Sequence, residues 1–110
     1  MREQRDRVTT RSTRLTVRPL AKELPSLLAE RDLSLRGLAE RVGVTHSHLS
    51  RATRGANGKT VGGDLAGRIA IALDLPADYF PEYREAAVVE RLQNDPSLRD
   101  RLYRQLKRST

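Results

Sequence analysis

Residues 33–55 have the sequence LSLRGLAERVGVTHSHLSRATRG, and this stretch indicates the fold most clearly. Ser34 and Thr45 each precede a short run with apolar residues at helical spacing, and both have a hydroxyl oxygen that can accept from the backbone N–H groups of a first helical turn. Gly43 lies between the two runs, where a left-handed residue typically ends a helix. The spacing therefore predicts helices at 35–42 and 46–54 joined by a tight turn, which is a helix-turn-helix.

Hydrophobic staples support both predicted helix starts. Such a staple joins the residue before the cap to the residue four positions into the helix. The two pairs are Leu33 with Leu38, and Val44 with Leu49. Each pair brackets its own cap, which supports Ser34 and Thr45 as the starts of the two helices.

A further helix is predicted before the motif. Leu20, Leu24, Leu27 and Leu28 recur at i, i+4, i+7 and i+8, so they share one helical face. Pro25 interrupts this stripe and lacks a backbone donor. The helix is therefore expected either to begin near Pro25 or to kink there, and to end around residues 31–32.

After a glycine-rich loop at 56–63, a fourth helix is expected with Asp64 as its cap. Leu65, Ile69 and Leu73 give it an apolar face at i, i+4 and i+8. Residues 75–76 end it, and the aromatic residues at 79–80 are expected to fold back into the core.

Two more helices are predicted at 82–93 and about 96–107. In the first, Ala86, Val89 and Leu92 are expected to face inward. The acidic residues are expected to be solvated and to pair with Arg84 and Arg91; they are Glu82, Glu85 and Glu90.

Asp95 followed by Pro96 is typical of a cap and a first helical residue. The last helix carries an apolar stripe of Leu98, Leu102 and Leu106. Two interpretations stay open for this pair of helices. They complete a core that four short helices would leave small, or they form a dimer interface.

Composition narrows the function classes. The chain has 110 residues, no cysteine, and 21 Lys+Arg against 14 Asp+Glu, a formal charge of +7. Disulfide scaffolds and Cys-ligated zinc are excluded.

No apolar run approaches the ~18 residues that span a bilayer, and we expect a soluble, cytoplasmic, nucleoid-associated protein. The basic excess favours a polyanionic partner such as nucleic acid, although 18 of the 21 basic residues are Arg, which coding composition alone can produce.

Catalytic and metal sites are not indicated. No nucleophile–base set or paired-carboxylate motif is present, so no enzyme and no cofactor are expected. His46 and His48, the only histidines, lie two positions apart. On a helix they point about 200° apart and cannot share one ion.

Roughly residues 20–80 resemble the phage-repressor-like (Cro/repressor, XRE) helix-turn-helix family. The most specific parts are Leu-Ala at 38–39, Gly-Val-Thr at 43–45, Leu-Ser-Arg at 49–51 and Arg-Gly at 54–55. The resemblance implies an all-α, lambda-repressor-like bundle of four to five helices, with one or two additional C-terminal helices.

The resemblance also implies residue roles on double-stranded DNA. The base-reading positions are His46, Ser47 and Arg51. The positions expected to touch phosphate or backbone are Arg36, Thr45, His48, Arg54, Asn57, Lys59 and Thr60. Arg36 is included because Leu35 stands where the family often has a phosphate-binding Gln.

The N-terminal segment has two interpretations. It is either a disordered tail or a basic arm on the phosphates or in the minor groove, with Arg11, Arg14 and Arg18 as its contacts. The resulting organisation is an arm at 1–18, a DNA-binding domain at 19–81 and a helical extension at 82–110.

The predicted function is transcriptional regulation, most often repression, by a protein that binds its operator as a homodimer, with the C-terminal helices as the candidate interface. Two alternatives stay open. One is an antitoxin-like module whose partner is another protein, and the other is a structural DNA binder with little sequence preference.

Overall fold

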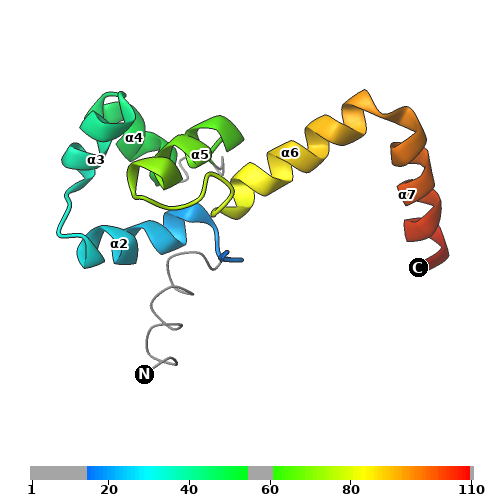
Figure 1. The fold of residues 1–110 in the computed structure, drawn as a ribbon, viewed down its shortest axis with the longest axis horizontal. Coiled ribbons are helices and arrows are strands. Elements are labelled where there is room, and N and C mark those ends of the chain that lie inside the picture. Colours follow the sequence, from blue (N-terminus) through cyan, green and yellow to red (C-terminus); the bar gives the residue numbers. More distant parts are fainter. Residues whose placement is uncertain (1–14, 55–60, 110) are drawn as a thin grey trace, which may run out of the picture.

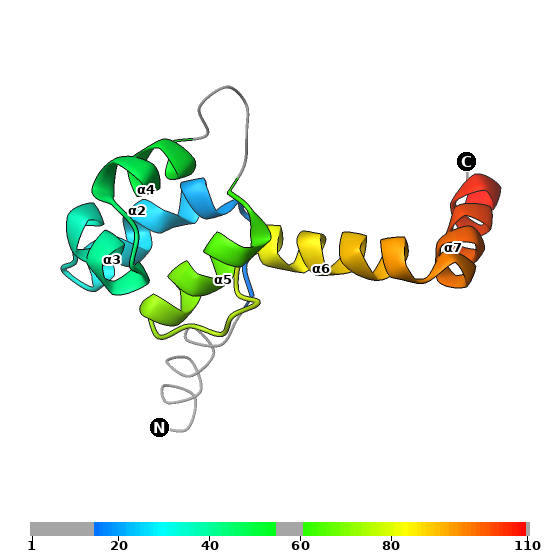
Figure 2. The ribbon, with the colours of Figure 1, turned by 90° about the horizontal axis from the view of Figure 1, so that it is seen from above.

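The computed structural model describes residues 15–54 and 61–109, and this part of the chain is all helical. The helices are α2 (Leu20–Glu30), α3 (Leu35–Val42), α4 (His46–Thr53), α5 (Gly63–Ala72), α6 (Pro81–Asn94) and α7 (Pro96–Ser109). Helices α2 to α5 cluster together, whereas α6 leads away from them and α7 bends sharply aside at the far end of α6 (Figure 1, Figure 2). The predicted all-α class and the two helices of the central motif are therefore confirmed.

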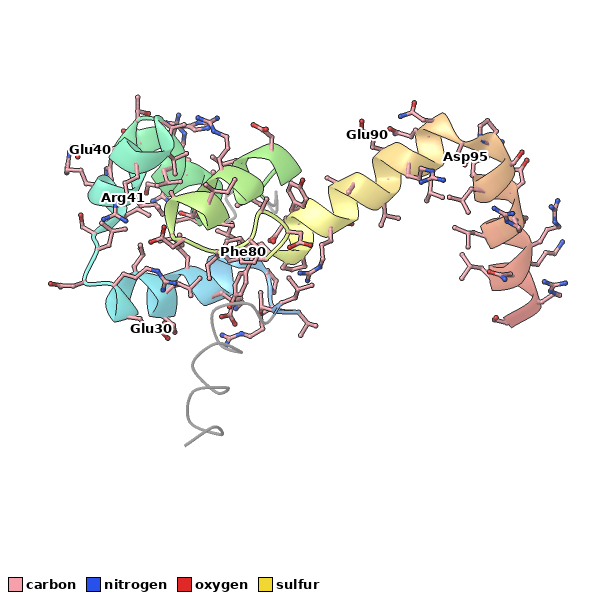
Figure 3. The ribbon with its side chains drawn as sticks, viewed as in Figure 1. Glu30, Glu40, Arg41, Phe80, Glu90 and Asp95 are labelled. Atoms are coloured by element: carbon pink, nitrogen blue, oxygen red, sulfur yellow. The ribbon has the colours of Figure 1, made fainter. Side chains whose placement is uncertain are left out.

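The core is formed by α2 to α5 and the turn that follows them. Its fully buried large side chains are Phe80, Leu20, Leu38, Leu49, Ile69 and Leu73. Figure 3 shows Phe80 at the centre of this cluster, near α2 and the start of α6. The ring of Tyr79 stands edge-on to that of Phe80 at a centroid distance of 5.1 Å, so the predicted return of both aromatic residues into the core is confirmed.

Helix α2 begins earlier than Pro25. Its first turn is already formed by bonds from the N–H groups of Lys22 and Glu23 to the carbonyl oxygen of Pro19, at 2.9 and 3.2 Å. Pro25 therefore lies inside the helix, and the alternative of a start near it is wrong. Burial of Leu20 and Leu24 on the core explains this, because tertiary packing outweighs the missing donor of one proline.

Glu82 corrects a second expectation, because it is not a solvated charge. It is 9% exposed, and its Oε1 and Oε2 accept from the backbone N–H of Leu20 at 3.2 and 3.0 Å. Pro19 precedes α2 and has no side-chain acceptor. The carboxylate of Glu82 thus caps α2 from 62 residues away and holds the first turn of α6 against it.

The arginines of α6 also have partners other than those expected. Arg84 donates to the carbonyl oxygens of Asp78 and Tyr79 at 2.8 and 2.9 Å, and to that of Thr16. Arg91 pairs with Asp95 at 3.5 Å. Arg84 thus fixes the start of α6 to the loop before it and to the segment that precedes α2.

Helix α5 begins at Gly63, so the prediction of Asp64 as its cap is wrong. Asp64 lies in the first turn and faces Arg68 at 3.9 Å. A Cβ on Gly63 would lie 2.5 Å from the Cβ of Ala86. The missing side chain lets α5 start directly against α6, which a sequence pattern does not reveal.

The C-terminal helices do not face inward as predicted. Ala86 and Val89 are exposed and Leu92 is half-buried, because α6 leads away from the bundle and is exposed from Glu85 onward except at Leu92. No residue of α7 is buried. Completion of the core by α7 is therefore not the arrangement that the chain adopts.

Asp95 caps α7 as expected. Its Oδ1 accepts from the N–H of Leu98 at 3.1 Å. This backbone hydrogen bond, with help from Arg91, lowers the pKa of the Asp95 carboxyl below its usual value.

Candidate nucleic-acid interface

The turn between α3 and α4 is built around Gly43. Its φ of 90° lies in the left-handed region that glycine tolerates best. The N–H groups of Gly43 and Val44 both donate to the carbonyl oxygen of Ala39, at 2.8 and 3.0 Å. These bonds close the end of α3 and direct the chain into α4.

Arg68 of α5 stabilises the same turn from outside. Its guanidinium donates to the carbonyl oxygen of Val42 at 2.7 Å, next to Gly43. Sequence reasoning missed this residue, because nothing local links position 68 to a turn 26 residues earlier. Its pairing with Asp64 at i, i+4 is the only pattern that marks it.

A second arginine ties α3 to α5. Arg41 donates to the carbonyl oxygen of Ala72 at 3.4 Å, and Figure 3 shows it between the two helices. We therefore assign Arg41 a structural role, which is to hold α3 against α5.

The start and the rotation of α4 are fixed by three side chains. Thr45 accepts from the N–H of His48 at 3.0 Å, as predicted for the cap. Leu49 is completely buried. The hydroxyl of Thr53 donates to the carbonyl oxygen of Leu49 at 2.8 Å. With Leu49 fixed in the core, the opposite edge of α4 must face outward.

That outward edge carries the predicted DNA contacts. Ser47, His48, Arg51 and Arg54 are exposed, and His46 is half-buried. Helix α4 and its two caps, Thr45 and Arg54, therefore bring together six of the predicted contacts on about two turns. Arg36 is also exposed but lies on α3.

The electrostatics of this edge suit an anionic partner. From Thr45 to Arg54, which covers α4 and its two caps, the sequence holds no Asp or Glu, while it has Arg51 and Arg54. The N-terminal end of α4 adds the partial positive charge of its free N–H groups. Phosphate groups are the ligands that such a surface attracts.

Other predicted contacts lie outside the described residues, namely Arg11, Arg14, Asn57, Lys59 and Thr60. Arg18 is described, and its guanidinium pairs with Glu23 at 3.2 Å and donates to the carbonyl oxygen of Lys22 at 3.5 Å. Arg18 is thus held against α2, although its side chain remains exposed.

A family model described as helix-turn-helix matches residues 26–80, which is half of the chain. The chain belongs to the Cro/repressor-like (XRE) helix-turn-helix family. Its matched segment runs from within α2 through α3, α4 and α5 to Phe80. Comparisons with curated proteins and with solved structures gave no significant match.

Membership of this family makes the chain a DNA-binding helix-turn-helix regulator in general terms. Residues 1–25, all of α6 and all of α7 lie outside the matched segment. None of the helices in the described ranges has the length and apolar character needed to cross a membrane.

Proposed function

We propose that the chain represses transcription by occupying a specific operator, with α4 in the major groove of double-stranded DNA. The observation that carries this proposal is the position of α4. Its buried side is fixed by Leu49 and its cap by Thr45, so that an acid-free edge is presented to solvent. A rigid helix of this diameter fits the major groove.

Sequence choice is assigned to His46, Ser47 and Arg51. The guanidinium of Arg51 can donate two hydrogen bonds to O6 and N7 of guanine, which discriminates against other bases by about 1–3 kcal/mol. Ser47 is short and contributes little discrimination. His46 can bond a base edge in either protonation state.

Affinity is assigned to phosphate contacts. Thr45, His48 and Arg54 border the base-reading positions on α4, and Arg36 of α3 adds a further cation. Each phosphate neutralised makes the logarithm of the binding constant fall by about 0.9 per logarithmic unit of salt. The predicted loop contacts Asn57, Lys59 and Thr60, and the arm with Arg11, Arg14 and Arg18, add to the same salt-dependent binding.

Operators of two-fold symmetry fit a homodimer with recognition helices about 34 Å apart. We therefore propose a homodimer as the operator-bound form. The domain at 19–81 supplies the DNA contacts, and the extension at 82–110 is available for association.

The test starts with selection of bound sites from a random pool of duplexes, followed by gel-shift titration of the selected site. Arg51→Ala should weaken the selected site about 10- to 100-fold and leave random duplexes almost unchanged. Arg54→Ala should weaken both equally and reduce the salt slope by about 1. Lys22→Ala serves as the matched control for Arg54→Ala, because it also removes one positive charge, but from the exposed side of α2.

Other outcomes would contradict the proposal. If selection yields no enriched motif and Arg51→Ala weakens every duplex alike, then the protein is a weakly specific DNA binder. If a second protein co-purifies in equal amount and no duplex binds, the function is protein interaction.

A further inference from the structure

The fold leaves apolar side chains exposed mainly on α6 and α7. Four of the seven exposed large apolar side chains in the described residues lie there, so this surface is the main apolar area without a partner. Val88 and Val89 are 56% and 44% exposed, and Tyr103 and Leu106 are 62% and 67% exposed. Exposed apolar surface of this kind marks an interaction site.

Helix α7 also lacks the packing that would stabilise it. None of its residues is buried, and Figure 2 shows it beyond the end of α6, away from α2 to α5. An isolated helix of about 12–15 residues is only marginally stable in water. In its leucine stripe Leu98 and Leu102 are half-buried and Leu106 is exposed, so a partner that covers the stripe would supply the missing burial.

The charges of the two helices indicate which surface that partner presents. Helix α7 carries five basic residues and one acidic residue; they are Arg99, Arg101, Arg104, Lys107, Arg108 and Asp100. Two α7 helices side by side would therefore repel each other. The partner surface must combine apolar residues with negative charge.

Helix α6 has this combination. Glu85 lies three and four positions before Val88 and Val89, so all three share one helical face. Glu85 and Glu90 form no ion pair within the described ranges, whereas Arg84 and Arg91 are held by carbonyl groups and by Asp95. With three Glu and two Arg, α6 has a formal charge of −1, opposite in sign to that of α7.

We propose that a second copy of this chain covers the surface by a reciprocal exchange. The leucine stripe of α7 packs on the Val88 and Val89 face of α6 in the other copy, and the same contact forms in the opposite direction. This arrangement is isologous, as a two-fold dimer requires. This inference rests on the proposed function, because a two-fold dimer would present one α4 helix to each half of a palindromic operator.

The length of the helices sets the expected strength of association. Each of the two helices has 14 residues and is therefore about 21 Å long. Two helix pairs of this length give a small interface with charged edges. Such interfaces associate weakly, so we expect a dissociation constant in the micromolar range.

Sedimentation velocity of the full chain over a range of concentrations tests this proposal. The wild-type protein should change from monomer to dimer. Leu106→Glu should remove the dimer without changing the unfolding temperature of the helix-turn-helix bundle. Ile71→Glu is the matched control: Ile71 is 60% exposed on α5, and the variant should dimerise like the wild type.

A charge variant separates the exchange from a direct α7–α7 contact. Glu85→Arg should weaken the exchanged dimer at least about 10-fold, because it places a like charge opposite α7. Added salt should weaken the wild-type dimer. A dimer that is indifferent to Glu85→Arg, or that is strengthened by salt, would show that the α7 helices pack on each other and would overturn the exchange.

Failure of the interface and failure of the DNA-binding function give different results. A wild-type protein that stays monomeric at every concentration but binds a selected half-site in a gel shift overturns only the interface. A dimer that selects no DNA sequence overturns only the proposed repressor function.

Discussion

Replacing Glu82 with alanine should destabilise the bundle far more than its place in a charged helix suggests. The carboxylate accepts from the N–H of Leu20 through both oxygens, at 3.2 and 3.0 Å, and the residue is 9% exposed. Leu20 itself is completely buried, so water cannot readily replace the lost acceptor. The N-terminal end of α2 would lose its only side-chain cap in the described structure.

The magnitude follows from the kind of bond. A hydrogen bond to a charged group contributes about 1.5–3 kcal/mol, and a carboxylate at a helix N-terminus adds about 0.3–1 kcal/mol. Glu82→Ala should therefore lower the free energy of unfolding by about 2–4 kcal/mol. For a domain of this size that corresponds to a fall of roughly 10–30 °C in the unfolding temperature.

Thermal unfolding followed by far-UV circular dichroism measures this shift. Glu90→Ala on the exposed part of α6 is the matched control and should change the unfolding temperature by less than about 4 °C, since surface substitutions rarely exceed about 0.5 kcal/mol. Glu82→Gln keeps an acceptor oxygen but loses the charge, so it should fall between the two. If Glu82→Ala unfolds at the same temperature as Glu90→Ala, the assignment of Glu82 as the cap of α2 is refuted.

Two further predictions concern the helix-turn-helix, and a third concerns the junction of α6 and α7. Leu49→Ala should cost about 2–5 kcal/mol in urea unfolding, because Leu49 is completely buried and its loss leaves a cavity beneath α4; a cost below 1 kcal/mol would contradict its role as the anchor. Gly43→Ala should cost about 1–2 kcal/mol, because φ is 90° there, and Gly43→Asn should cost less, since asparagine tolerates this conformation; equal costs would argue against the left-handed turn. Asp95 has a lowered pKa in the folded state, so its contribution is complete above the unfolded pKa of about 3.8 and is lost as the pH falls through the folded value. The helicity of α7, measured by NMR chemical shifts, should therefore fall only under strongly acidic conditions. Asp95→Asn should remove the part of this pH dependence that the cap contributes and leave the part from Asp100, whose pKa is lowered by its hydrogen bond with Arg99.

The caps and the turn of the helix-turn-helix follow from local sequence. Ser34, Thr45 and Asp95 were predicted as caps, and each accepts the expected backbone N–H from three residues ahead. Gly43 was predicted as the left-handed helix end and has a φ of 90°. These interactions join residues a few positions apart, so the local sequence contains both partners.

The contacts that hold the helices together, and the direction in which α6 and α7 leave the bundle, depend on residues that lie far apart in the sequence. Glu82 caps a helix that begins 62 residues earlier, and Arg68 bonds a turn 26 residues away. Periodicity identifies an apolar face, but it does not identify what covers that face. Helix α6 therefore matches its predicted extent closely. Ala86 and Val89 are nevertheless exposed, because the core around Phe80 is completed by α2 to α5 and leaves no buried surface for this part of α6.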